Sequence, residues 1–193
     1  MKHYETELPA GYRAAFIIDA ADKKTGVRLN IAAGIVMAVI IGLAALMIIR
    51  PKDLLGEGFA SALRLGILGA GLIAYMVLHE LTHGAAYKLL TGRKLTFGFT
   101  ATVAYCGVPD IYVYRLASMI ALLAPFTVFT LVFGGLTLGL SNPSDRFLAA
   151  MALAVHVGGC AGDLYDTGLY LLRFRDPRTL MRDTGPKQTF YVP

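Results

Sequence analysis

Charged residues are scarce in this chain. Of its 193 residues, 16% are charged and 56% are hydrophobic, whereas a typical soluble domain has about 25% charged residues. The mean hydropathy of +0.60 reflects the same deficit. The apolar residues are pooled in long uncharged runs rather than spread at the spacing of a globular core. This composition favours an integral membrane protein and excludes a disordered chain or a collagen-like fibre.

Cysteine is nearly absent, since Cys106 and Cys160 are the only two. Both lie in apolar surroundings and form no CxxC pair, which excludes a disulfide scaffold. The net charge of +5 does not indicate nucleic-acid binding, because the basic residues flank the apolar runs, as they do at membrane borders. No cleavable signal peptide is expected, since the first apolar run follows the charged segment 1–30 and is too long for one.

Four apolar segments are long enough to cross a bilayer, which takes about 20 residues. Residues 31–49 and 116–140 contain no charged side chain, whereas residues 65–90 and 147–172 each contain a few ionisable groups. The sequence therefore predicts an α-helical integral membrane protein with about four transmembrane helices. The ionisable groups within the second and fourth spans are where we expect its chemistry.

The distribution of Lys and Arg predicts the orientation of these spans. Thirteen of these residues lie in the N-terminal segment, the loop after the second span and the C-terminal tail, against four in the other two loops. By the positive-inside rule, both termini are cytoplasmic. We expect a multi-pass plasma-membrane protein with a cytoplasmic segment 1–30, a membrane-embedded domain 31–172 and a cytoplasmic basic tail 173–193.

The loop between the second and third spans has the pattern of a strand. Residues 94–106 alternate between two sets of side chains, with aromatic and β-branched residues among them. This period of two predicts a short β-strand or a bent hairpin. Further along, Pro125 lies within the third span, where proline is expected to kink the helix.

The second span contains an H-E-x-x-H motif formed by His79, Glu80 and His83. On a helix, this spacing places both imidazoles on one face about one turn apart, where they can chelate zinc. Glu80 is then expected to hold and deprotonate a water molecule at the metal. Three ionisable side chains within five residues of a span are costly unless they are used, so a metal site is favoured over two structural histidines.

A catalytic zinc takes three protein ligands, and the last span offers Asp163, Asp166 and His156 as the third. The second and fourth spans run in the same direction, so equal offsets from their preceding arginines give similar depths at about 1.5 Å per residue. The two histidines of the motif lie 15 and 19 residues beyond Arg64, and Asp163 lies 17 residues beyond Arg146. Depth thus favours Asp163, with Asp166 and His156 as alternative ligands or as supporting groups. We expect one zinc per chain.

These residues resemble the putative zincin peptidases, a family of bacterial membrane proteins. The resemblance is carried by Leu8-Pro9, Gly11-Tyr12, the stretch DAADKKTGVRLNI, HELTHG at 79–84, Phe97-Gly98 and the H…GCAGDLYD segment from His156 to Asp166. The order of a helical H-E-x-x-H, a strand-bearing segment and a later Asp beside a Gly is also similar to site-2-type intramembrane metalloproteases. The resemblance implies that His79, His83 and Asp163 are the metal ligands and that Glu80 is the base.

The leading hypothesis is a zinc-dependent, membrane-embedded endopeptidase that hydrolyses a peptide bond at or within the cytoplasmic half of the bilayer. Its partners would be membrane lipid and a membrane-protein or peptide substrate. One alternative is a non-hydrolytic zinc transporter or sensor, but transport needs polar groups on both sides of the site, and the uncharged spans offer almost none. The other is a catalytically inactive structural protein, which the intact Glu80 argues against. The sequence makes no prediction of oligomeric state.

A substrate helix must be extended before water can attack its peptide bond. The predicted strand could offer an edge to which such an unwound segment adds. The residues expected to form this substrate strand are Phe97, Phe99, Thr100 and Thr102. The alternative is a self-contained hairpin that only anchors the loop.

Overall fold

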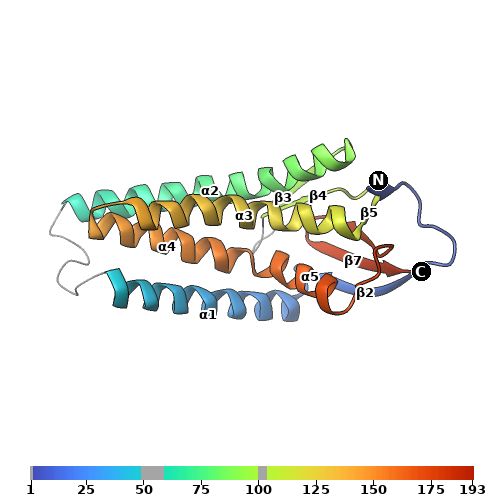
Figure 1. Cartoon of the computed structure of the whole chain (residues 1–193), viewed down its shortest axis with the longest axis horizontal. Helices are drawn as coiled ribbons and strands as arrows, with labels where there is room; N and C mark the ends of the chain where they lie inside the picture. Colours follow the sequence, from blue (N-terminus) through green and yellow to red (C-terminus); the bar gives the residue numbers. More distant parts are fainter. Residues whose placement is uncertain (1, 49–58, 100–103) are drawn as a thin grey trace. The chain divides into compact units, whose positions relative to one another are not determined.

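The computed structural model describes residues 2–48, 59–99 and 104–193, which contain five helices and seven strands (Figure 1). The helices are α1 (Lys23–Ile48), α2 (Phe59–Thr91), α3 (Arg115–Gly139), α4 (Pro143–Gly159) and α5 (Ala161–Leu172). The strands are β1 (Tyr4–Glu5), β2 (Arg13–Asp19), β3 (Thr96–Phe99), β4 (Ala104–Gly107), β5 (Tyr112–Tyr114), β6 (Leu180–Asp183) and β7 (Lys187–Val192).

Three helices in the described part of the chain, α1, α2 and α3, are each long and apolar enough to span a membrane. The expected fourth span is not one straight helix, because α4 and α5 are bent by 50° at the break between them. The break follows Gly158 and Gly159, which lower helix propensity by about 1 kcal/mol each relative to alanine. The structure therefore has three membrane-spanning candidates, or four if the bent pair is one span.

The chain divides into two compact units, which we describe separately. The sheet unit comprises residues 1–29, 77–125 and 162–193, and the helical unit comprises residues 30–76 and 126–161. The C-terminal part of α2, the N-terminal part of α3 and nearly all of α5 belong to the sheet unit, together with all seven strands.

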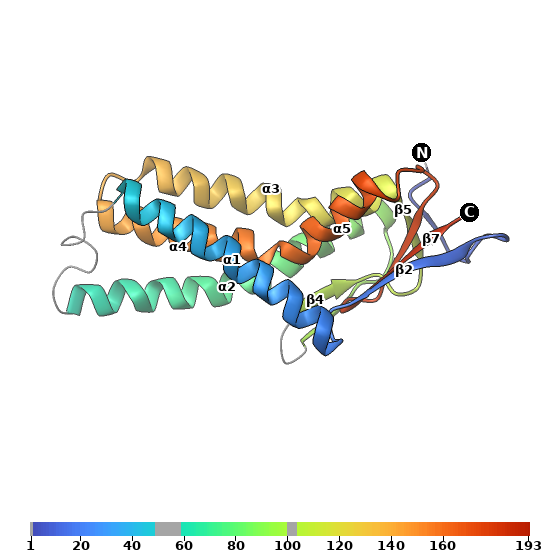
Figure 2. The ribbon, with the colours of Figure 1, turned by 90° about the horizontal axis from the view of Figure 1, so that it is seen from below.

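The sheet unit is built on a five-stranded antiparallel sheet with the strand order β1-β5-β6-β7-β2. The long pairing of β2 with β7 runs from Arg13 opposite Val192 to Asp19 opposite Lys187 (Figure 2). The strands come from the N-terminal segment, the α2–α3 loop and the C-terminal tail. Sequence analysis did not predict this sheet, because β1 and β5 are only two and three residues long and show no readable alternation.

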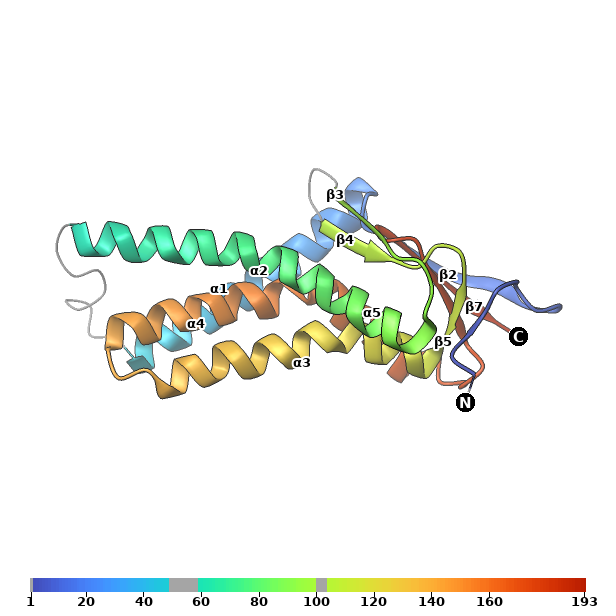
Figure 3. The ribbon, with the colours of Figure 1, turned by 90° about the horizontal axis from the view of Figure 1, so that it is seen from above.

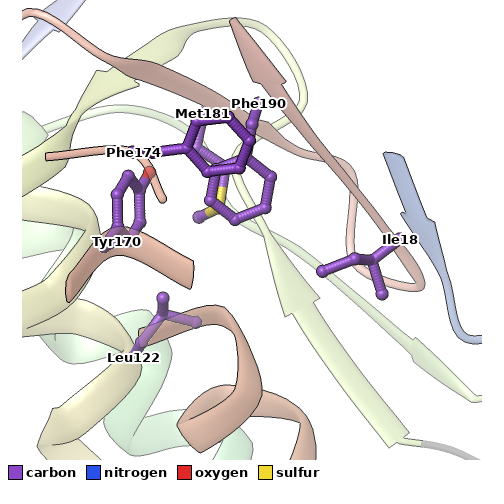
Figure 4. Close-up of a cluster of buried hydrophobic side chains, with 6 residues drawn as sticks. All are labelled: Ile18, Leu122, Tyr170, Phe174, Met181 and Phe190. Carbon is purple, nitrogen blue, oxygen red and sulfur yellow. The ribbon is translucent and has the colours of Figure 1, made fainter. Parts of the chain in front are cut away.

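Two apolar clusters fasten this sheet to the helices of its unit. The first joins strands β2, β6 and β7 to α3 and α5 and contains Ile18, Leu122, Tyr170, Phe174, Met181 and Phe190 (Figure 4). The second joins α2 to the β4–β5 segment and α3 and contains Tyr87, Val108, Ile111, Val113, Ala117 and Ala121. Each large apolar side chain buried in this way contributes about 1.5–3 kcal/mol.

The hairpin expected between the second and third spans is present as β3 paired with β4, from Thr96 opposite Gly107 to Phe99 opposite Ala104 (Figure 3). It lies against α2, because a Cβ atom on Gly84 would come within 2.7 Å of the Phe97 ring. Glycine at this position therefore permits β3 to approach the helix closely. Thr100 and Thr102 fall outside the described residues.

The helical unit contains the rest of α1, α2 and α3 together with α4. Asn142 caps α4 by accepting from the backbone N–H groups of Ser144 and Asp145, and Pro143 occupies the first turn, where its missing N–H costs nothing. Small residues permit close helix contact here, since a Cβ atom on Gly158 would lie 2.9 Å from the Ala33 carbonyl oxygen of α1.

Candidate metal centre

The two histidines of the motif lie on one face of α2, and both are buried. Their Nε2 atoms are 3.2 Å apart. Asp163, in the first turn of α5, places its Oδ2 atom 3.4 Å from the Nε2 of His79 and 3.4 Å from that of His83. Three potential ligand atoms from two helices of the sheet unit therefore converge.

The spacing of these three atoms fits a zinc ion. Tetrahedral zinc with bonds of about 2.0–2.1 Å holds its ligand atoms about 3.3 Å apart. The distances between His79, His83 and Asp163 are 3.2–3.4 Å, as expected for three corners of such a tetrahedron. The donor set of two imidazoles and one carboxylate is also one that zinc uses in catalytic sites. These residues could therefore hold a metal ion.

A hydrogen bond at Nδ1 fixes the orientation of the His83 ring. Its Nδ1 atom lies 2.9 Å from the backbone carbonyl oxygen of Ala121 in α3. A carbonyl oxygen can only accept, so the proton of this bond is on Nδ1. A proton on Nδ1 leaves Nε2, which faces Asp163 and His79, as the ring nitrogen that can bind a metal.

Glu80 follows His79 on α2, and its side chain is half-buried. The backbone N–H of Cys106 in β4 faces its carboxylate. The hairpin therefore lies beside Glu80, and His83 and Asp163 are among the charges acting on the carboxylate. A carboxylate held next to a metal site can serve as a general base.

Asp166 lies one turn beyond Asp163 on α5 and is buried. It does not belong to the group formed by the two histidines and Asp163 among the described residues. Its Oδ1 atom is buried without a hydrogen-bond partner in the same described part of the chain. Asp166 is therefore buried one turn from Asp163 but is not among the three converging ligand-type residues.

His156 lies on α4 in the helical unit and is fully buried there. Its Nδ1 atom is 2.8 Å from the Tyr75 hydroxyl, and its Nε2 atom is 3.1 Å from the Thr130 hydroxyl and 3.3 Å from the Phe126 carbonyl oxygen. The rings around it are Tyr75, Phe126, Phe129 and Phe133. Both ring nitrogens thus have partners within this unit, as in a packed structural histidine.

The expected substrate strand is partly exposed. Phe97 packs against Gly84, whereas Phe99 is 73% exposed and so free to contact another chain. Within the described residues β3 pairs only with β4 in a two-stranded sheet. Its outer edge therefore keeps backbone groups available for pairing.

Sequence analysis missed Asp183, the last residue of β6 in the C-terminal hairpin of the sheet unit. Its Oδ2 atom accepts a 2.8 Å bond from the Tyr87 hydroxyl, and its Oδ1 atom accepts from the Gly185 N–H at 2.9 Å. Its backbone carbonyl accepts from the Val108 N–H at 2.9 Å. Burial raises the pKa of Asp183 to about 6. One signal was available, since Tyr87 lies on the same face of α2 as His83, one turn further on.

Cys106 in β4 is also buried near the site. Burial raises the pKa of its thiol to about 12, and the nearby charges of Asp183 and Glu80 add to this effect. The thiol is therefore neutral at physiological pH, whereas metal binding and nucleophilic attack both require the thiolate.

The family model described as putative zincin peptidase matches residues 72–176. The matched segment includes His79, Glu80, His83 and Asp163 and ends before β6, so Asp183 lies outside it. No curated protein and no solved structure matches the chain.

Proposed function

The chain belongs to the putative zincin peptidase family, and on this basis we propose that it is a zinc-dependent, membrane-embedded endopeptidase. The observation that carries the proposal is the convergence of three ligand-type atoms, from His79, His83 and Asp163, at separations of 3.2–3.4 Å. Glu80 beside them supplies the base that hydrolysis needs.

In this proposal the side chains of His79, His83 and Asp163 hold one zinc ion per chain, which would supply Lewis-acid polarisation of the scissile carbonyl when bound. The Glu80 carboxylate accepts a proton from the attacking water and passes it to the departing amine. The Cys106 N–H keeps that carboxylate in place during the transfer. The Ala121 carbonyl keeps the imidazole of His83 in its metal-binding tautomer.

We further propose that both termini are cytoplasmic and that the site works in the cytoplasmic half of the plasma membrane. The five-stranded sheet supports part of this topology, because paired strands must lie on one side of a bilayer. Its strands come from the three segments that hold 13 of the basic residues. The positive-inside rule then makes that side cytoplasmic. On this view segments 1–30 and 173–193 flank a membrane-embedded metalloprotease domain over 31–172.

The proposed substrate is a membrane-protein segment that unwinds and adds to the outer edge of β3. Main-chain pairing would extend it, and apolar contact with Phe99 would hold its side chains. Phe97 also belongs to β3, whereas the other two expected residues, Thr100 and Thr102, lie outside the described residues. An unpaired edge cannot face lipid without cost, so an incoming peptide would also satisfy the free backbone groups.

The test is cleavage of a fluorogenic transmembrane peptide by the purified protein in lipid micelles. We expect cleavage by the wild type, its loss with a zinc chelator and its return on adding zinc. Glu80→Gln should retain zinc and lose cleavage. A zinc transporter or sensor would bind zinc without cleavage that depends on Glu80, and an inactive structural protein would show no cleavage in either state.

A further inference from the structure

Pro125 lies in the interior of α3, where most residues donate a backbone hydrogen bond to the carbonyl four residues earlier. Proline has no N–H, and its ring also pushes that carbonyl away from the helix axis. The carbonyl four residues before Pro125 is that of Ala121. Proline at this position therefore leaves the Ala121 oxygen without its helical donor.

The freed oxygen is the one that receives the His83 imidazole, with Nδ1 at 2.9 Å. His83, Ala121 and Pro125 are all buried. A buried carbonyl without a donor would cost about 1–3 kcal/mol. The hydrogen bond from His83 therefore replaces the helical bond that Pro125 cannot donate. In turn, the carbonyl satisfies the Nδ1 proton of the histidine.

We propose that Pro125 is a positioning residue for His83, acting through the Ala121 carbonyl. This inference rests on the proposed function, because it concerns how a zinc ligand is held. The proline prevents α3 from using the Ala121 oxygen for its own helical bond. That oxygen then holds the imidazole so that Nε2 faces His79 and Asp163, each within 3.4 Å.

The alternative role of Pro125 is simply to bend α3. The two roles differ in what they require of residue 125. Positioning requires only that the backbone there has no N–H, whereas bending requires the bulk of the pyrrolidine ring. Replacing proline by alanine restores the N–H, and replacing it by lactic acid, the α-hydroxy analogue of alanine, removes the N–H again without restoring the ring.

The experiment measures zinc affinity by chelator competition for the purified wild type, Pro125→Ala and the protein carrying lactic acid at position 125. Loss of a group that orients a metal ligand typically weakens metal binding 10–100-fold. We expect about a tenfold or greater loss for Pro125→Ala and recovery to near the wild-type affinity with lactic acid. Pro143→Ala is the matched control, because Pro143 occupies the first turn of α4 and should leave the affinity unchanged.

A second readout is the NMR signal of the His83 Nδ1 proton in the metal-free protein. We expect a hydrogen-bonded Nδ1 proton in the wild type and in the lactic acid protein, and loss of that hydrogen bond in Pro125→Ala. Wild-type zinc affinity in Pro125→Ala would overturn the inference, as would equal weakening in the alanine and lactic acid proteins. A wild-type protein without zinc affinity would instead overturn the proposed function, so the two failures are distinguishable.

Discussion

The hydroxyl of Tyr87 donates a 2.8 Å hydrogen bond to the carboxylate of Asp183, across 96 residues of sequence. The bond joins α2, one turn beyond His83, to the last residue of β6, next to the turn that leads to β7. A Cβ atom on Gly107 would lie 2.5 Å from the Gly185 nitrogen, so this turn also packs closely against β4. Since the Cys106 N–H of β4 faces Glu80, the C-terminal hairpin packs against the strand that lies beside the candidate site.

The first prediction concerns the dependence of stability on Asp183. Its pKa of about 6 in the fold lies above the ordinary value of 3.8, because burial penalises the charged form. A group of this kind stabilises the fold fully below its unfolded pKa, and that contribution is lost as the pH rises through about 6. The rise of this pKa from 3.8 to about 6 corresponds to about 3 kcal/mol in the free energy of unfolding.

We therefore expect the free energy of unfolding of the wild type to fall between pH 4 and pH 7. In Asp183→Asn this fall should be absent. The ionisable groups whose charges act on Asp183, or on which it acts, are Glu80, His83, Tyr87, Cys106, Asp166 and Tyr170. They remain in the variant, so the difference between the two pH profiles reports Asp183 together with its coupling to these groups. Asp110→Asn, at an exposed position, is the control. Identical profiles for Asp183→Asn and the wild type would contradict the prediction.

The second prediction separates the candidates for the third ligand. Asp163→Ala should weaken zinc binding at least as much as His79→Ala, because its Oδ2 atom lies 3.4 Å from both Nε2 atoms. Asp166→Ala and His156→Ala should have milder effects. Zinc content by elemental analysis checks this set. The assignment fails if His156→Ala or Asp166→Ala strips the metal while Asp163→Ala keeps it.

The third prediction tests the substrate strand. Phe99→Ala should raise KM for a transmembrane peptide by at least about fivefold, because an apolar contact of this size is worth about 1–3 kcal/mol. Zinc content should not change, since Phe99 is 73% exposed. Leu89→Ala is a matched control, because Leu89 is 87% exposed on α2. An unchanged KM in Phe99→Ala would leave the hairpin as an anchor of the loop.

The fourth prediction concerns topology. Single cysteines introduced at Lys23 and Lys187, in a protein whose native cysteines are replaced by serine, should not react with a membrane-impermeant thiol reagent in intact cells. Both should react after the cells are opened, because both positions are exposed. Labelling of either position in intact cells would reverse the proposed orientation.

Local spacing and depth were enough to predict which residues of the site lie together. The H-E-x-x-H spacing alone places His79 and His83 on one helix face. The prediction of Asp163 required only that the second and fourth spans run in the same direction, so that equal residue offsets along them give similar depths. The first argument uses the regular rise of one helix, and the second survives the 50° bend between α4 and α5 because the bend comes only a few residues before Asp163.

Contacts that depend on irregular structure could not be predicted in this way. The bond from Tyr87 to Asp183 requires the five-stranded sheet, whose shortest strands leave no pattern in the sequence. The bend between α4 and α5 does not alter the hydropathy of residues 147–172. The sequence indicated a kink at Pro125, but not that the carbonyl it frees would face His83.

The most direct test of the account is to measure zinc content and peptide cleavage in the same preparations of wild type, Glu80→Gln and His83→Ala. The account predicts about one zinc per wild-type chain, because two imidazoles and one carboxylate complete the protein share of a tetrahedral site. It predicts the same zinc content without cleavage in Glu80→Gln, and neither zinc nor cleavage in His83→Ala. Wild-type cleavage by Glu80→Gln, or full zinc content in His83→Ala, would contradict it.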